Sequence, residues 1–191
     1  YDYHLSTSSL AKFFRNSKNS FSTRSNGWLL PDRIKSKKFR NMINKKEKRL
    51  VGISWFTMQN KENSEDHNIE LKKLINCLDT NNVEIVNLQY GEVNSDILEI
   101  ERDLGVKIHQ LPNLDIWKDI DCLASLIEAC DEIVSIDNIT IHLAGALGKK
   151  SKALLKNPPD WRWGHSRQNS FWHSNVELFN KDRSYIFKKF D

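Results

Sequence analysis

The sequence predicts an α/β fold built on a doubly wound parallel sheet. Apolar runs typical of buried strands begin near residues 50, 83, 106, 132 and 151. One helical pattern separates each consecutive pair, which is the alternation of a parallel sheet with right-handed crossovers. The chain has 191 residues, of which 39% are hydrophobic and 28% charged, so it is long enough to bury a substantial core.

The first two strands are expected at residues 50–55 (LVGISW) and 83–88. Between them, apolar residues recur at helical spacing over residues 66–78. Asn81 and Asn82 then break the pattern, so the helix ends before them.

The middle of the chain continues the alternation. A helix is expected over residues 94–104, with Gly105 as its C-terminal cap, and a third strand follows over residues 106–111. The apolar spacing in residues 117–130 predicts the third helix, and residues 132–136 form the fourth strand.

The last predicted elements are a helix over residues 138–147, closed by Gly148, and a strand over residues 151–155. Residues 1–49 do not continue the alternation. We expect them to be the end of a preceding domain and a connecting helix over residues 32–44.

Composition excludes several classes of protein. No apolar run approaches the roughly 20 residues that a membrane-spanning helix needs, and the first 25 residues lack the apolar core of a signal peptide. The three cysteines, Cys77, Cys122 and Cys130, lie within apolar patterns without CxxC spacing, which favours reduced, buried thiols and a cytoplasmic location.

Charge is distributed unevenly along the chain. Residues 1–50 carry 13 Lys and Arg against 3 Asp and Glu, whereas the remainder carries 16 against 22. The basic residues do not alternate with stacking aromatics, so we expect a solvated helix face, or a wall beside an anionic ligand, and not a nucleic-acid partner.

Ligands of open parallel sheets bind beyond the carboxyl ends of the strands. Asp137 and Asn138 follow the fourth strand and lead directly into a helix, whose first turn holds Asn138 and Thr140. Free backbone N–H groups at that helix start favour a phosphate, although Asp137 or Asn138 could equally act only as a helix cap. No GxGxxG motif follows a strand, and no GxxxxGK[ST] motif is present.

Asp119 and Asp121 form a DxD sequence, a metal-binding motif in other proteins. Both residues fall at the start of the expected third helix, where side chains two positions apart diverge. We therefore expect them to complement the helix dipole and not to share a metal ion.

Several segments together resemble the C-terminal half of the glycosyltransferases that are attached to tetratricopeptide repeats. These enzymes are related to the heptosyltransferases and to the O-linked N-acetylglucosamine transferases. The segments are VSIDNITIHLAGALGKK (134–150), PPDWRW (158–163), SFWHSNVELF (170–179), LVGISW (50–55), VNLQYGE (86–92), DIDCLASLIEACDEIVS (119–135) and YDYHLSTSSLAKFFR (1–15).

The resemblance implies a GT-B architecture, in which two Rossmann-like domains face a cleft. Residues 50–191 would be the domain that holds a nucleotide-sugar donor, and residues 1–49 the tail of the acceptor domain plus a linker. The chain begins with Tyr1, so we expect most of the acceptor domain, and possibly the repeats, to lie upstream. The transfer would need no metal or other cofactor, and the acceptor, a protein or a glycan, is unknown.

The resemblance also assigns donor-binding residues, whereas a catalytic base would belong to the upstream domain. The assigned positions are Ser54, Trp55, Gln89, Asp137, Asn138, Thr140, His142, Asp160, Arg162 and Trp163.

Three positions depart from the family pattern. Ile139 stands where relatives have Gly, Thr or another small residue, and His67 stands where they have a basic pair. Asn180 lies where a C-terminal RQ pattern is expected. These departures support the alternative that the domain has lost catalysis and acts as an interaction module.

Overall fold

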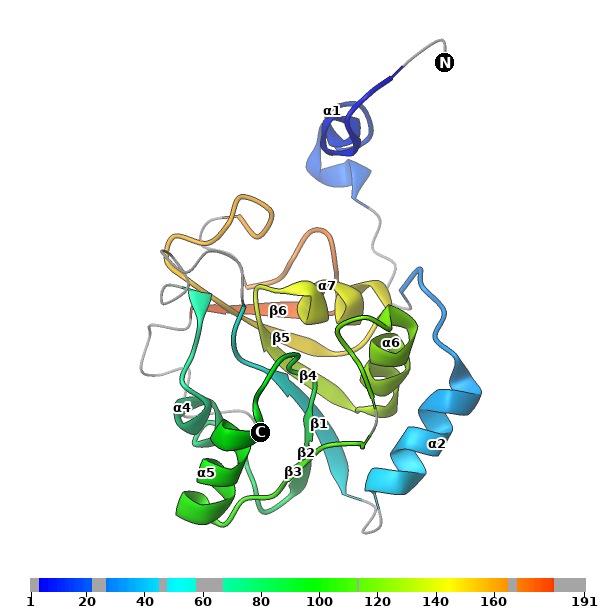
Figure 1. Ribbon diagram of the computed structural model, residues 1–191. Coiled ribbons are helices and arrows are strands. Elements are labelled where there is room, and N and C mark those ends of the chain that lie inside the picture. The colour runs from blue at the N-terminus through cyan, green and yellow to red at the C-terminus, as the bar shows by residue number, and fades with distance from the viewer. Residues whose placement is uncertain are drawn as a thin grey trace.

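The computed structural model describes residues 4–21, 27–44, 48–57, 67–112, 114–164 and 168–180. Within these ranges six strands form one sheet, in the order β3-β2-β1-β4-β5-β6 (Figure 1). Every pair of neighbouring strands runs parallel. The α/β fold with a doubly wound parallel sheet is therefore confirmed.

The strands are β1 (Arg49–Ser54), β2 (Val83–Asn87), β3 (Ile108–His109), β4 (Glu132–Ile136), β5 (Ser151–Leu155) and β6 (Val176–Asn180). The helices are η1 (Thr7–Leu10), α1 (Ala11–Phe14), η2 (Lys18–Ser20), α2 (Arg33–Ile43), α4 (Leu71–Ile75), α5 (Asn94–Leu104), α6 (Ile120–Ala129) and α7 (Ile139–Ala146).

The predicted elements match these bounds unevenly. β4, β5 and α5 occupy the residues expected for them, whereas α4 and β3 are much shorter than their apolar patterns suggested. β6 was not predicted. It pairs along its whole length with β5, a contact between segments that are not adjacent in the chain.

Helix ends follow the capping residues that the sequence contains. The side chain of Asp32 accepts hydrogen bonds from the N–H groups of Ile34 and Lys35 at the start of α2. Asp119 accepts from Cys122 N at 2.8 Å and so caps α6, the role expected for this carboxylate. Gly105 ends α5 with a φ of 65°, in the left-handed region that favours glycine.

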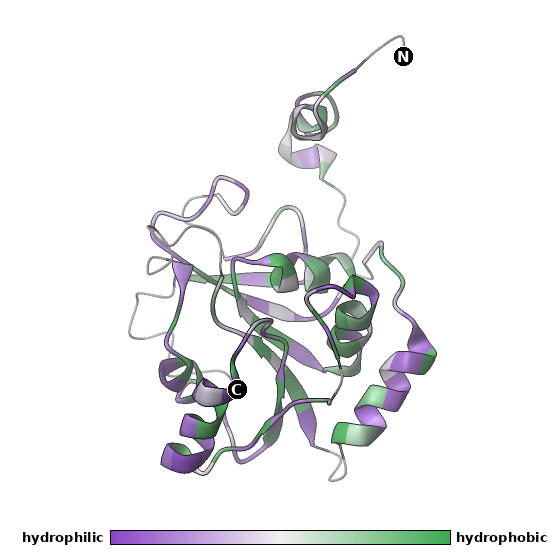
Figure 2. Cartoon of the chain, viewed as in Figure 1, coloured by the Kyte–Doolittle hydropathy of each residue, from purple (hydrophilic) through white to green (hydrophobic). Residues whose placement is uncertain are grey.

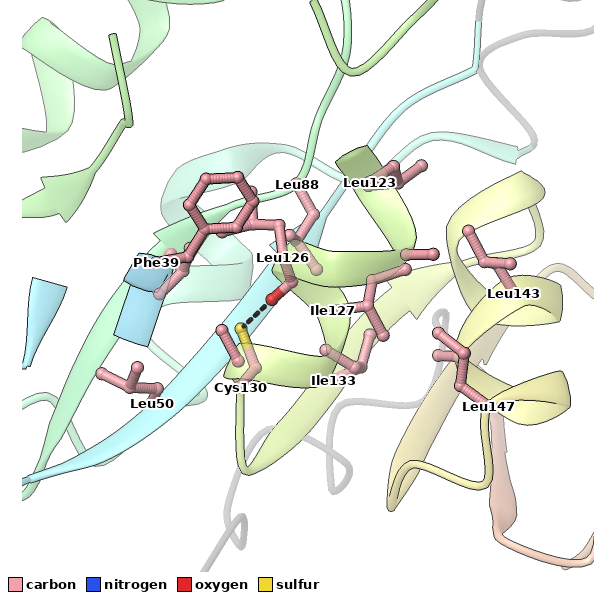
Figure 3. Close-up of a cluster of buried hydrophobic side chains, with 14 of the residues drawn as sticks. Phe39, Leu50, Leu88, Leu123, Leu126, Ile127, Cys130, Ile133, Leu143 and Leu147 are labelled. Atoms are coloured by element: carbon pink, nitrogen blue, oxygen red, sulfur yellow. Dashed lines mark hydrogen bonds between the residues drawn. The ribbon is translucent and has the colours of Figure 1, made fainter. Parts of the chain in front are cut away.

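Helices cover both faces of the sheet. α4 and α5 pack with side chains from β1, β2 and β4 to form one apolar cluster. α2, α6 and α7 contribute to the other, in which Figure 3 shows Phe39 beside Leu126, with Leu143 on the far side of Ile127. In Figure 2 the hydrophobic residues accordingly gather on the strands and on the inward sides of the helices.

The three cysteines are buried free thiols, as predicted. Cys130 lies between α6 and β4, where its Sγ donates to the carbonyl oxygen of Leu126 (Figure 3). Burial raises the pKa of the Cys130 thiol to about 12 and that of Cys77 to about 11. Neither thiol is therefore a nucleophile at neutral pH.

The segment before α2 contacts the sheet domain through α7. The N–H groups of Trp28 and Leu29 donate to the carbonyl oxygen of Ala146, at the end of that helix. The preceding helices η1 and α1 stand away from the sheet (Figure 1). Their aromatic residues Phe13 and Phe14 are exposed.

No helix in the described part of the chain is both long and apolar enough to cross a lipid bilayer.

Candidate functional site

The carboxyl ends of β1 and β4 mark the point where the chain changes from one face of the sheet to the other. After β1 the chain passes to the face covered by α4 and α5, and after β4 it passes to the face of α6 and α7. The two strands are neighbours, with Ser54 beside Ser135. Such a reversal of strand order leaves a crevice where ligands of this fold class bind.

Gln89 ties the ends of β1 and β2 together. Its side-chain oxygen accepts three hydrogen bonds, from the Ser54 hydroxyl at 2.8 Å and from the N–H groups of Trp55 and Phe56 at 2.9 Å. Asn87 in turn accepts from the N–H of Gln89. Gln89 is 1% exposed, so its amide is used within the protein.

Asn138 extends this network to β4 and α7. Its side-chain nitrogen donates to the Ser54 hydroxyl at 2.7 Å, and its oxygen accepts from the N–H of Thr140 and from the Ser135 hydroxyl, both at 3.0 Å. Asn138 is thus the N-cap of α7 and a link between strands. The structure brings Ser54, Gln89 and Asn138 together, as predicted, but their polar atoms bond to one another.

Asp137 and His142 face each other across the first turns of α7. The Asp137 Oδ1 and His142 Nε2 atoms lie 3.3 Å apart, and the His142 ring stacks on Trp163 with centroids 4.9 Å apart. Burial opposes ionisation of Asp137, yet the adjacent polar groups of His142 and Trp163 and the nearby Arg162 charge outweigh it, so the pKa of this carboxyl lies below its usual value. Asp137 is therefore an anion held beside a histidine.

The loop after β5 brings the remaining predicted residues to this end of the sheet. Arg162 lies 3.4 Å from the carboxylate of Asp160, in a turn closed by the Trp163 N–H and the Asp160 carbonyl oxygen. Trp163 is 1% exposed and packs with Ile141 of α7. Arg162 and the neighbouring Trp161 are exposed.

Two predicted residues lie where a ligand would not meet their polar or aromatic groups directly. Thr140 is fully buried, and its hydroxyl oxygen has no hydrogen-bond partner. The Trp55 ring belongs to the apolar cluster on the opposite face, with α4 and α5. We assign both to shaping the site.

A cavity of about 510 Å³ adjoins the network at the carboxyl ends of β2 and β3. Gln89 forms part of its wall, and the rings of Tyr90 and Trp117 meet within it, with centroids 4.5 Å apart. Gln110 and Asp115 add polar groups to the rim. Apolar walls with a few convergent polar groups are typical of small-molecule sites.

Sequence reasoning missed Trp117 as a candidate site residue, and it placed Tyr90 at a strand end without giving it a binding role. Tyr90 directly follows Gln89, so its place after a strand was a usable signal. Trp117 was expected inside the third helix. That helix begins only at Ile120, which leaves Trp117 in a turn with 60% of its surface exposed.

Among the residues that the structure describes, no group of three or more His, Cys, Asp or Glu side chains is placed to hold a metal ion. Asp119 is the N-cap of α6, and Asp121 lies in the first turn of that helix.

Comparison with known proteins shows a likeness of fold. Heptosyltransferase II of E. coli, an ADP-heptose lipopolysaccharide enzyme, superposes with a TM-score of 0.55 and 16% sequence identity. The match covers 79% of this chain and 44% of that enzyme. The described part of the chain therefore has an α/β fold with a parallel sheet that matches part of a GT-B glycosyltransferase fold.

Two further proteins are similar. A family 9 glycosyl transferase from Veillonella parvula gives a TM-score of 0.49 and 12% identity, over 78% of this chain and 40% of that one. Protein FlbA of Caulobacter vibrioides is 42% identical over 71 residues, which are 37% of this chain and 12% of FlbA. No protein-family model matches the sequence. The chain thus spans less than half of each of these proteins, and the likeness to heptosyltransferase II is one of fold.

Proposed function

We propose that this chain contains the donor-binding domain of a glycosyltransferase. It binds a nucleoside diphosphate sugar without a metal ion, and the sugar passes to a protein or glycan acceptor held by another domain. The cavity of about 510 Å³ beside the Gln89 and Asn138 network carries the proposal, because it lies at the carboxyl ends of β2 and β3, next to the side chains that meet at the switch point between β1 and β4.

The nucleoside belongs in this cavity. A planar base stacks on an aromatic face whatever its identity, and the adjoining Tyr90 and Trp117 rings offer such a surface. The carboxylate of Asp115 accepts hydrogen bonds from ribose hydroxyls, and the amide of Gln110 bonds to the base edge.

The diphosphate belongs at the start of α7. The first turn of a helix has N–H groups without intrahelical partners, and its dipole favours negative charge. Because Asn138 uses the N–H of Thr140, the neighbouring N–H groups are the ones left for the phosphate oxygens. Arg162 supplies a mobile positive charge nearby.

Asp137 is assigned to hydroxyl groups of the donor and not to its phosphates, since two anions repel. His142 holds the carboxylate in place. Stabilisation of the departing diphosphate by the helix start and Arg162 replaces the metal ion. The base that deprotonates the acceptor would come from a second domain, which we expect upstream, possibly with tetratricopeptide repeats. The buried thiols fit a cytoplasmic location.

Calorimetric titration of the chain with UDP, GDP, ADP and CDP tests the proposal. One of the four should bind, and Trp117→Ala should weaken it roughly tenfold or more, because base–aromatic stacking contributes ~1 to 3 kcal/mol. Trp28→Ala is the matched control, since Trp28 is 63% exposed and lies outside this cavity. Binding of none of the four nucleotides at millimolar concentration would contradict the proposal.

A noncatalytic binding module is the second candidate. Ile139 favours it, because this aliphatic side chain is 50% exposed in the first turn of α7, where the phosphate would lie. A module of this kind would leave all four nucleotides unbound in the same titration.

A further inference from the structure

A second cavity, of about 570 Å³, lies along α7 and is separate from the proposed nucleoside site. One stripe of the helix, Ile139, His142, Leu143 and Ala146, forms its floor. The walls come from the N-terminal segment, from the linker before α2 and from the loop between β5 and β6.

Aromatic contacts join the two ends of the chain across this cavity. The Phe21 ring stacks on Phe171 with centroids 5.3 Å apart and meets Trp172 edge to face at 4.9 Å. The Trp172 ring also meets the Trp161 ring edge to face, with centroids 6.3 Å apart. The N-terminal segment therefore closes a cavity that the sheet domain alone leaves open.

The side chains that line this cavity have an unusual chemistry. Among the residues that the structure describes, the lining consists of Phe, Trp, Leu, Ile and Ala residues together with two arginines and two histidines, without a carboxylate, carboxamide or hydroxyl group. Arg162 is paired with Asp160. Within the described residues no carboxylate lies within 4.0 Å of Arg15, whose guanidinium stands 5.8 Å from the centre of the Phe21 ring. Among the described residues that line the cavity, Arg15 is thus the arginine without a carboxylate partner.

This lining discriminates between classes of ligand. A sugar or a nucleoside needs hydrogen-bond acceptors for its hydroxyl and amino groups, and the lining side chains offer mainly donors. A quaternary ammonium group is repelled by Arg15, although aromatic walls would otherwise suit it. An apolar ring packs well against the aromatic walls, and an anionic group forms an ion pair with the Arg15 guanidinium.

We propose that this cavity binds an apolar, ring-containing molecule that carries one anionic group. Its volume suits a ligand of ordinary small-molecule size. Ile139 and His142 belong both to this cavity and to the first turns of α7, so the ligand would lie beside the proposed donor site. The further assignment of this molecule as the acceptor, or as part of it, rests on the proposed function.

Fluorescence titration with two matched dyes tests the binding step. The probe 8-anilinonaphthalene-1-sulfonate is an aromatic anion, and N-phenyl-1-naphthylamine is its uncharged counterpart. We expect both to bind with one dye per chain, the anion about tenfold more tightly, because a charge-assisted hydrogen bond contributes ~1.5 to 3 kcal/mol.

Two variants locate the dyes. Arg15→Gln should weaken the anionic dye about tenfold while leaving the neutral dye unchanged. Ile120→Trp should weaken both dyes, because Ile120 lines the cavity and is 47% exposed, so a larger side chain fills the opening without entering the core.

Two controls lie outside the cavity. Arg33→Gln removes an exposed positive charge from α2, and Phe14→Ser removes an exposed ring from α1. Neither should alter the affinity for either dye. Dye binding that responds to Phe14→Ser but not to Ile120→Trp would overturn the proposal, as would equal effects of Arg15→Gln on both dyes.

Competition with nucleotides separates this proposal from the proposed function. A nucleoside diphosphate that binds without displacing the anionic dye supports two sites. One-for-one displacement would assign the cavity to the nucleotide and overturn the proposal. If no nucleotide binds but the dyes respond to Arg15→Gln and Ile120→Trp as expected, the cavity assignment holds and the donor assignment fails.

Discussion

The imidazole of His173 occupies the space beside Gly145 on α7. A β-carbon on Gly145 would lie 2.4 Å from Cγ and 2.7 Å from Nδ1 of His173, closer than real β-carbon contacts. The N–H of His173 donates to the Ser170 hydroxyl, which fixes this part of the loop before β6. Because glycine has no side chain, the loop before β6 can pack directly against α7 at Gly145.

Gly145→Ala should destabilise the protein. Alanine favours a helix by about 1 kcal/mol over glycine, but overpacking a buried site costs about 1 to 3 kcal/mol. We expect a net loss in the free energy of unfolding, measured by urea denaturation. In a His173→Ala background the clash is gone, so Gly145→Ala should become neutral or stabilising. An equal effect in both backgrounds would show that His173 is not the obstacle.

His173 should make stability fall with acid. Burial and the nearby His142 lower the pKa of His173 to about 4 from an ordinary value of 6.5. Because the unfolded state takes up the proton first, the free energy of unfolding should fall by about 3 kcal/mol between pH 6.5 and pH 4 and then level off with respect to this group. His173→Phe should remove that part of the pH dependence. Equal slopes for the two proteins would refute the assignment.

Asp137 should affect stability over a lower range of pH than His173 does. Its folded-state pKa is lowered, so its contribution to stability is present above the unfolded value of about 3.9 and is lost as the pH falls through the folded value. Asp137→Asn should therefore be less stable than the wild type at pH 7, and this difference should shrink at pH 3. Urea denaturation at the two pH values measures it.

Gln89→Leu should cost about 3 kcal/mol of stability, because it leaves three buried donors, at Ser54, Trp55 and Phe56, without an acceptor. Gln168→Leu is the control, since Gln168 is exposed and its replacement should shift stability by less than about 0.5 kcal/mol. Similar midpoints in urea for both variants would contradict this account of the network.

Ile139→Thr should tighten binding of the nucleotide that the titration identifies. It adds a hydroxyl donor in the first turn of α7, and one hydrogen bond contributes ~0.5 to 1.5 kcal/mol, which corresponds to roughly a twofold to tenfold gain in affinity. Ile139→Val keeps the position aliphatic and should leave affinity unchanged. If the threonine variant binds no more tightly than the valine variant, the phosphate does not lie beside this residue.

Much of the fold could be predicted from local patterns. The buried run of β4, the extent of α5 and its C-terminal cap Gly105 are features of short segments, and each lies where the sequence predicts it. β6 escaped prediction because five residues after a long loop carry little periodicity. Its pairing with β5 supplies the stabilisation that its own sequence does not reveal.

For the candidate site, the sequence by itself determined which polar residues end the strands. Only the tertiary structure decided what those residues do. Gln89 and Asn138 lie 35 and 84 positions after Ser54 in the sequence, yet both side chains form hydrogen bonds with the Ser54 hydroxyl once β1, β2 and β4 are adjacent. A strand pattern specifies that a residue lies at an end, whereas the partner of its side chain depends on which strands become neighbours. That choice is made by burial of the whole sheet between its two helix layers.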